Sequence, residues 1–235
     1  MAERGIHERA PLKLAGALLF TAGAAILMGI ITAEALYPAA YSTFENTISD
    51  LGGTRPPDSV VLQPSAAIFD ITMLVTGAMI IAAAWLVHRA FRRRAVTISL
   101  ACYGLGVFGI GVFPGNTTPH PLIAMFVFVA AGVAAILAYK VEPPPLRQLS
   151  VVLGTITLAS LVLGSFFLEW GPVAELGEGG IERWVAYPAV LWLTVFGGYL
   201  MGSRTAEAPP APERGSSAAV RGNGKVPVGT AGGRP

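Results

Sequence analysis

The sequence predicts an all-α polytopic membrane protein, a bundle of six transmembrane helices. Of its 235 residues, 53% are hydrophobic and only 13% are charged, and the mean hydropathy is +0.61. A soluble domain carries about 25% charged residues, so this chain has too few charges to coat a water-facing surface. Its apolar runs are also long, and about 20 apolar residues cross a hydrocarbon core about 30 Å thick.

Six apolar segments are long enough to span a membrane. We expect these spans at about residues 13–36, 64–87, 95–113, 121–139, 149–168 and 184–202. The first segment has an alternative interpretation as a signal peptide, because Ala33-Glu34-Ala35 resembles a cleavage site. Signal-peptide apolar cores run only about 7–15 residues, and the greater length here favours a retained helix.

Two terminal segments flank this membrane domain at residues 13–202. Residues 1–12 form a short N-terminal segment of mixed charge, predicted to be cytoplasmic. Residues 203–235 are rich in Ala, Pro, Gly and Arg and have almost no large apolar side chains. Such a segment cannot bury enough surface to offset its ordering entropy, so we expect a disordered cytoplasmic tail.

The basic residues alternate between loops, and this pattern predicts the orientation. The second loop alone carries Arg89, Arg92, Arg93 and Arg94, whereas loops one, three and five carry only Arg55 and Arg183 among several carboxylates. Loops with excess Lys and Arg stay in the cytoplasm. We therefore expect an N-in, C-in multi-pass protein of the plasma (cytoplasmic) membrane, with the odd loops outside.

The net charge of +2 is too small to indicate a nucleic-acid partner, and membrane lipids are the partners we expect. The single cysteine, Cys102, excludes an intrachain disulfide and a Cys-based metal site. His7 and His88 lie on the predicted cytoplasmic side, away from His120, which excludes a three-His zinc site. The sequence thus predicts neither a metal nor a cofactor, and it sets no oligomeric state.

Unusual polar residues gather at the predicted outer face. Ionisable residues within spans are costly and usually face a cavity or a partner. The expected ligand-binding residues, from the first loop and the outer ends of the spans, are Asn46, Ser49, Asp50, Asp70, His120 and Arg183. A structural role is the alternative: Asp70 would pair with Arg183, and Glu34 would reach interfacial water.

A catalytic role has three candidates, Ser49, Asp50 and His120, because a His can activate a Ser while an acid orients it. The Gly-x-Ser-x-Gly turn that exposes a nucleophile is missing. Asn, Ser and Asp also bond to nearby backbone groups in turns, which gives the segment around Ser49 a simpler role.

Four short motifs stand in the loops and spans. They are Asn46-x-Ile48-Ser49-Asp50-Leu51-Gly52, Ile68-Phe69-Asp70, Gly111-Val112-Phe113-Pro114 with His120-x-x-x-Ala124, and Gly180-Ile181-Glu182-Arg183. Together, over roughly residues 13–202, they resemble the DUF998 family, six-span prokaryotic membrane proteins of unknown function. The sequence departs from that pattern at Asp70, where Asn is expected.

The segment Ile48-Ser49-Asp50-x-Gly52, followed by Pro56-Pro57, is also similar to the Frag1/DRAM/Sfk1 group. Members of that group are associated with lipid-anchor remodelling, lipid asymmetry and autophagy. The resemblance implies a lipid-linked role at the outer face.

These observations predict an integral membrane protein that binds or handles a lipid or small ligand in a polar outer-face pocket. A head group would lie against Arg183, His120 and Asn46, since Arg suits phosphate and carboxylate. One alternative is an intramembrane lipid-modifying enzyme with Asp50 and His120 as acid and base; the sequence favours binding but leaves catalysis open. Another is a structural or partner subunit. A small transporter is disfavoured because the spans show no internal repeat.

Overall fold

The computed structural model describes residues 2–203, and for residues 2–9 only the backbone. Its helices are α1 (Ala2–Ala35), α2 (Ser65–Phe91), α3 (Arg94–Val112), α4 (His120–Leu137), α5 (Leu146–Phe166), α6 (Gly171–Ala174) and α7 (Gly177–Gly202), with short 3₁₀ turns η1 (Ser49–Leu51) and η2 (Ala138–Lys140). The regular structure of residues 2–203 is entirely helical, which confirms the predicted fold class. The predicted disordered tail lies outside the described residues.

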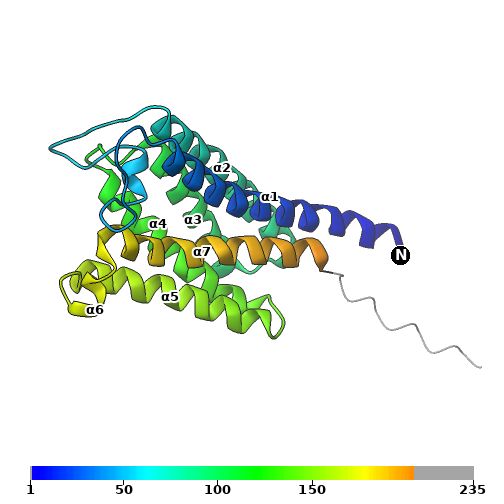
Figure 1. The fold of residues 1–235 in the computed structure, drawn as a ribbon. Helices are drawn as coiled ribbons and strands as arrows, with labels where there is room; N and C mark the ends of the chain where they lie inside the picture. Colours follow the sequence, from blue (N-terminus) through cyan, green and yellow to red (C-terminus); the bar gives the residue numbers. More distant parts are fainter. Residues whose placement is uncertain (1, 204–235) are drawn as a thin grey trace, which may run out of the picture. The chain divides into compact units, whose positions relative to one another are not determined.

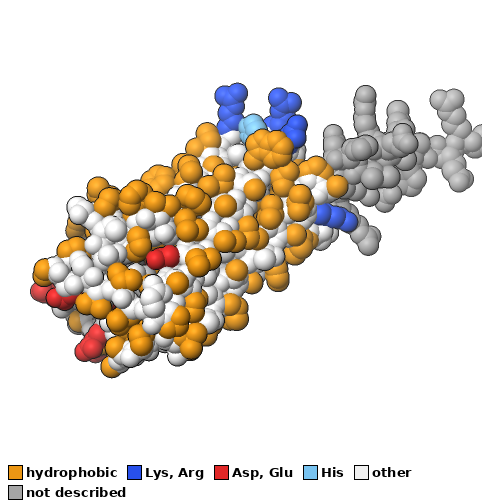
Figure 2. Space-filling view, turned by 90° about the horizontal axis from the view of Figure 1, so that it is seen from above, with side chains coloured by type: hydrophobic (Ala, Val, Ile, Leu, Met, Phe, Trp, Pro, Cys, Tyr) orange, Lys and Arg blue, Asp and Glu red, His pale blue; other side chains and the backbone are white. Residues whose placement is uncertain are grey.

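Within residues 2–203, six helices are long and apolar enough to cross a membrane: α1 from Ala10 onward, α2, α3, α4 with η2, α5 and α7. The chain is therefore a multi-pass integral membrane protein. Figure 2 shows Lys and Arg side chains at one end of the bundle and Asp and Glu side chains at the other. This separation agrees with the predicted N-in, C-in orientation, which itself stays a prediction.

The two ends of the bundle carry different connections, and we call them the loop end and the basic end. The loop end carries the α1–α2 loop (residues 36–64), the α3–α4 loop (113–119) and the α5–α7 connection (167–176). The basic end carries the α2–α3 and α4–α5 connections.

The six long helices form a closed ring. Each contacts the next along the chain from α1 to α5, α5 contacts α7, and α7 returns to α1 (Figure 1). The helices approach closely where glycine permits it: a Cβ on Gly197 of α7 would lie 2.3 Å from the backbone nitrogen of Phe20 on α1. Close approach at small residues replaces the hydrophobic drive that lipid cannot supply between helices.

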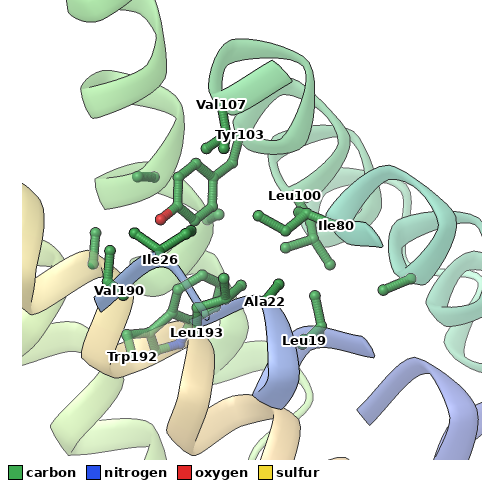
Figure 3. Packing of buried hydrophobic residues seen from close by; sticks show 14 of the residues in the cluster. Leu19, Ala22, Ile26, Ile80, Leu100, Tyr103, Val107, Val190, Trp192 and Leu193 are labelled. Atoms are coloured by element: carbon green, nitrogen blue, oxygen red, sulfur yellow. The ribbon is translucent and has the colours of Figure 1, made fainter. Parts of the chain in front are cut away.

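Apolar side chains fill the interior of the ring. Tyr103 of α3, Ile26 of α1 and Val190 and Leu193 of α7 point toward one another there (Figure 3). Trp192 and Phe196 of α7 stack at 5.4 Å between ring centroids and are almost fully buried. This packing holds α7 against α1, and thereby positions the polar residues at the N-terminal end of α7.

The boundary of the last span differs from the prediction. We expected a loop over residues 169–182 and a helix from 184, but α7 begins at Gly177. Glycine and glutamate suggested a loop, yet an acidic residue in a first turn, here Glu178, is favourable at a helix N-terminus. Arg183 therefore lies almost two turns inside α7 rather than at its start.

Candidate functional site

Arg183 is the anchor of the loop end. Its Nη2 donates to Glu34 of α1 at 2.5 Å and to the Tyr41 hydroxyl at 2.9 Å. Its Nη1 donates to the backbone carbonyls of Thr43 (3.3 Å), Asn46 (3.0 Å) and Gly179 (2.8 Å). The Arg183 side chain is only 11% exposed and that of Glu34 only 21%. Because a guanidinium has five N–H donors, this set of contacts leaves little of Arg183 for a ligand.

Tyr41 extends this network into the loop. Its hydroxyl donates to the Thr47 carbonyl at 2.9 Å while accepting from Arg183. Burial raises the pKa of the Tyr41 hydroxyl above its usual range, although the Arg183 guanidinium partly offsets that rise. The hydroxyl therefore keeps its proton and can serve as donor and acceptor at once.

The loop segment that follows is held by its own side chains. Thr47 N–H donates to Asp50 Oδ2 at 2.8 Å, and Asp50 N–H donates to Thr47 Oγ1 at 3.2 Å, so the pair closes the η1 turn. Asn46 Oδ1 accepts from Ser42 N–H at 2.9 Å. Asn46 and Asp50 thus serve as turn-forming residues, the simpler role that their residue types also predicted.

Glu182 joins this loop to α7 from the other side. Its Oε2 accepts from the backbone N–H of Ile48 at 2.7 Å, and its Oε1 accepts from the Ser49 hydroxyl at 2.9 Å. Each of the two carboxyl oxygens thus accepts one hydrogen bond from the α1–α2 loop. Glu182 and Arg183, consecutive on α7, therefore fix two different parts of the α1–α2 loop.

His120 begins α4 and is only 4% exposed. Its Nδ1 lies 2.8 Å from the Phe113 carbonyl oxygen. Because a carbonyl can only accept, Nδ1 carries the proton in the neutral ring and Nε2 presents a lone pair. Within residues 2–203, Nε2 is buried with no hydrogen-bond partner, so it is an unsatisfied acceptor.

A groove of about 290 Å³ runs between α4, α5 and α7 at the loop end. Its polar lining consists of Thr47, Ser49, Arg55, His120, Ser165, Glu178 and Glu182. Its apolar lining includes Met125 and Phe128 of α4, Leu161 of α5 and Val185 of α7. Met125 is 44% exposed, so the groove is open along the side of the bundle that faces lipid.

The groove adjoins a smaller space inside the ring. An apolar cavity of about 70 Å³ lies among α1, α2, α3, α4 and α7. The cavity and the groove share four lining residues, Ser49, Ala124, Phe128 and Glu182. The hydrogen-bonded pair of Ser49 and Glu182 therefore stands between the two spaces.

The structure brings only part of the predicted ligand-binding set together. Ser49 and His120 line the groove, while Arg183 lines a separate recess of about 570 Å³ on α5 and α7. Asn46, Asp50 and Asp70 are not among the lining residues of the groove. The fold therefore does not form a single pocket that contains Arg183, His120 and Asn46.

The Asp70–Arg183 pair, which was the structural alternative for Asp70, does not form, because Arg183 pairs with Glu34 instead. The Glu34 side chain, which we expected to reach interfacial water, carries this ion pair and stays 21% exposed. Asp70 lies beneath the α1–α2 loop, where a Cβ on Gly52 would come 2.6 Å from Asp70 Oδ1. Among the described residues, Oδ1 is buried and has no hydrogen-bond partner.

The hydrogen bonds of the catalytic candidates lead in different directions. Ser49 donates to Glu182, His120 bonds the Phe113 carbonyl, and Asp50 accepts from Thr47 N–H. Across residues 2–203, no hydrogen bond joins Ser49, His120 and Asp50 to one another. The Ser–His–acid arrangement weighed from the sequence is not assembled. The same part of the chain holds no group of three metal-ligating side chains.

Glu182 and Arg55 are site residues that the sequence interpretation missed. Glu182 was assigned to an acidic loop, although a helix started at Gly177 would have placed it on α7. Arg55 Nη1 lies 2.5 Å from Glu178 Oε1, and both side chains are well exposed. Only the folded loop shows that this ion pair lines the groove.

A closed ring of apolar helices with a polar loop cap defines the class, a polytopic α-helical membrane protein. Residues 15–199 match a family model described as "Protein of unknown function (DUF998)". The chain belongs to the DUF998 family, as its four motifs indicated. No curated protein and no solved structure matched the chain.

Proposed function

We propose that this protein binds a membrane lipid in the groove between α4, α5 and α7. One observation carries the proposal: the groove is polar at the loop end and apolar along its walls, in a part of the fold made of membrane-spanning helices. A ligand that matches both parts is amphiphilic, with a head group at the loop end and a chain along the helices.

The size and openness of the groove suit such a ligand. Its volume of about 290 Å³ is near the lower end of the roughly 300–1,000 Å³ of small-molecule pockets. Met125 and Ser165 are exposed on its rim, so a lipid can enter sideways without opening the ring. The similarity of the Ile48–Gly52 segment to the Frag1/DRAM/Sfk1 group, and a location in the plasma membrane, are compatible with this role.

The head group in this proposal lies against His120, Ser49 and the Arg55–Glu178 pair rather than against Arg183. Arg183 has its Nη donors committed to Glu34, Tyr41 and three carbonyls. Arg183 thus supports the site by holding the loop, while the groove residues contact the lipid.

A matched pair of variants on α5 tests the proposal. Ser165→Trp fills the groove, whereas Val162→Trp places the same side chain one turn away at a position that does not line it. Native mass spectrometry of the gently solubilised full-length protein, with lipid identification, is the measurement. We expect a specific lipid to co-purify with the wild type and with Val162→Trp, and to be lost from Ser165→Trp.

Equal, unselective lipid in all three proteins would overturn the proposal. The loop-end residues would then be a structural lock of a scaffold or partner subunit, which was the alternative from the sequence.

A further inference from the structure

We infer that the groove selects a head group that donates hydrogen bonds and carries no net negative charge, such as an ammonium or a set of sugar hydroxyls. This inference deepens the proposed lipid binding and rests on it. The observation behind it is the balance of donors and acceptors that line the polar end of the groove.

Two carboxylates and one imidazole supply acceptors at that end, beside the N–H donors of Arg55 and three hydroxyl groups. The Glu182 carboxylate uses one lone pair per oxygen for Ile48 N–H and the Ser49 hydroxyl. Since an ionised carboxylate has about four lone-pair positions, further acceptor positions remain. His120 adds its buried Nε2 lone pair, which has no partner within residues 2–203. The Phe113 carbonyl holds the ring proton on Nδ1, so Nε2 of the neutral ring, in a residue that lines the groove, can only accept.

The charges lining the groove favour the same ligand. They comprise the carboxylates of Glu178 and Glu182 and the single cation of Arg55, which is already paired with Glu178 at 2.5 Å. Arg183 is a second cation at the loop end, but it is paired with Glu34 and does not line the groove. With Arg55 paired to Glu178, the groove lining has no unpaired cation to balance a phosphate monoester. A like charge in a partly desolvated site is unfavourable.

The ligand chemistry has two sources among lipids, so the probes separate them. Full-length protein in phosphatidylcholine nanodiscs would be titrated with three lipids of identical acyl chains. Phosphatidylethanolamine supplies an ammonium, monoglucosyl diacylglycerol supplies hydroxyls, and phosphatidic acid supplies a phosphate monoester. We expect one of the first two to bind at least tenfold more tightly than phosphatidic acid, and Ser165→Trp to abolish that binding.

Two variants test the charge argument in opposite directions. Glu182→Gln removes a carboxylate acceptor, and we expect the preference over phosphatidic acid to fall about tenfold. Glu178→Gln frees Arg55 from its carboxylate partner, and we expect phosphatidic acid to bind several-fold more tightly. Glu169→Gln, exposed and outside the groove lining, is the control and leaves the preference unchanged.

The outcomes separate this inference from the proposed function. Tight binding of phosphatidic acid that Ser165→Trp abolishes would overturn the donor-rich head group and keep lipid binding. A preference that neither Glu182→Gln nor Glu178→Gln alters would also overturn it. If none of the three lipids bound above the phosphatidylcholine background, the proposed function itself would fail.

Discussion

Arg183 on α7 and Glu34 on α1, 149 residues apart in the sequence, meet at 2.5 Å at the loop end of the bundle. The pair closes the ring of helices, because α1 and α7 are its first and last members. Through its other contacts, the same guanidinium holds three carbonyls, two of them in the α1–α2 loop. One side chain thus couples the closure of the bundle to the shape of its polar cap.

We predict that Arg183→Ala lowers the free energy of unfolding by about 2–4 kcal/mol. This value lies between the cost of losing one hydrogen bond to a charged group and the cost of breaking a buried ion pair. Arg183→Lys should recover only part of that loss, because one ammonium cannot reach both Glu34 and the carbonyls. Thermal unfolding in detergent measures both variants. Arg93→Ala, exposed at the basic end, is the control. If Arg93→Ala were equally destabilising, the special role of the loop end would be lost.

We predict that Gly179→Ala distorts the loop–α7 junction. The added Cβ would lie 2.2 Å from the Asn46 carbonyl oxygen and 2.6 Å from that of Thr43, and backbone atoms cannot rotate away. Overpacking of this kind costs about 1–3 kcal/mol. The neighbouring Gly180→Ala is a matched control, since its Cβ would come only within 3.3 Å of the Leu176 Cβ.

The readout for these two variants is thermal unfolding together with protease cleavage of the α1–α2 loop. Only Gly179→Ala should unfold at a lower temperature and expose the loop to cleavage. Similar behaviour of the two variants would show that the loop does not depend on this close approach.

We predict a pH-dependent stability from Glu142, which lies between η2 and α5 at the basic end. Its side chain is 6% exposed, and within the described residues neither carboxylate oxygen has a hydrogen-bond partner. Burial raises the pKa of this carboxyl from 4.5 to about 7, although the nearby Ser150 hydroxyl offsets part of the rise.

Because the pKa is higher in the folded state, the folded protein binds more protons between about pH 4.5 and pH 7. The stability from this group is therefore fully present below the lower value and is lost as pH rises through about 7. Glu142→Gln, neutral at every pH, should unfold at a higher temperature than the wild type at pH 8 and lose this part of the pH dependence. Glu175→Gln, which is exposed, controls for the charge change. A Glu142→Gln variant with the wild-type pH profile would contradict the prediction.

We predict that the loop end is extracytoplasmic. Asp58→Cys in the α1–α2 loop and Arg93→Cys at the basic end, each in a Cys102→Ala background, place one exposed thiol at opposite ends. A membrane-impermeant maleimide on intact cells should label Asp58→Cys alone, and lysis should expose Arg93→Cys. The reverse pattern would invert the orientation.

The sequence by itself determined the class of protein. The lengths of the apolar segments determined the number and approximate positions of the spans. A helix needs about 20 apolar residues to cross a bilayer, and this requirement does not depend on how neighbouring helices pack. The sequence also predicted that the polar, turn-forming residues 46–52 lie in the loop between the first two spans. The start of α7 was missed because glycine and glutamate before residue 184 suggested a loop, whereas packing against the loop backbone extends the helix to Gly177.

Only the tertiary structure decided which polar residues meet. Asp70, Glu34 and Arg183 all stood near the loop end of their spans, so linear position could not choose between Asp70 and Glu34 as the partner of Arg183. The rotation of the helices and the packing of α7 on α1 bring Arg183 to Glu34. The same packing places Glu182 beside Ser49 at the groove. Pairing across a helix ring depends on three-dimensional packing, which sequence spacing within one helix does not encode.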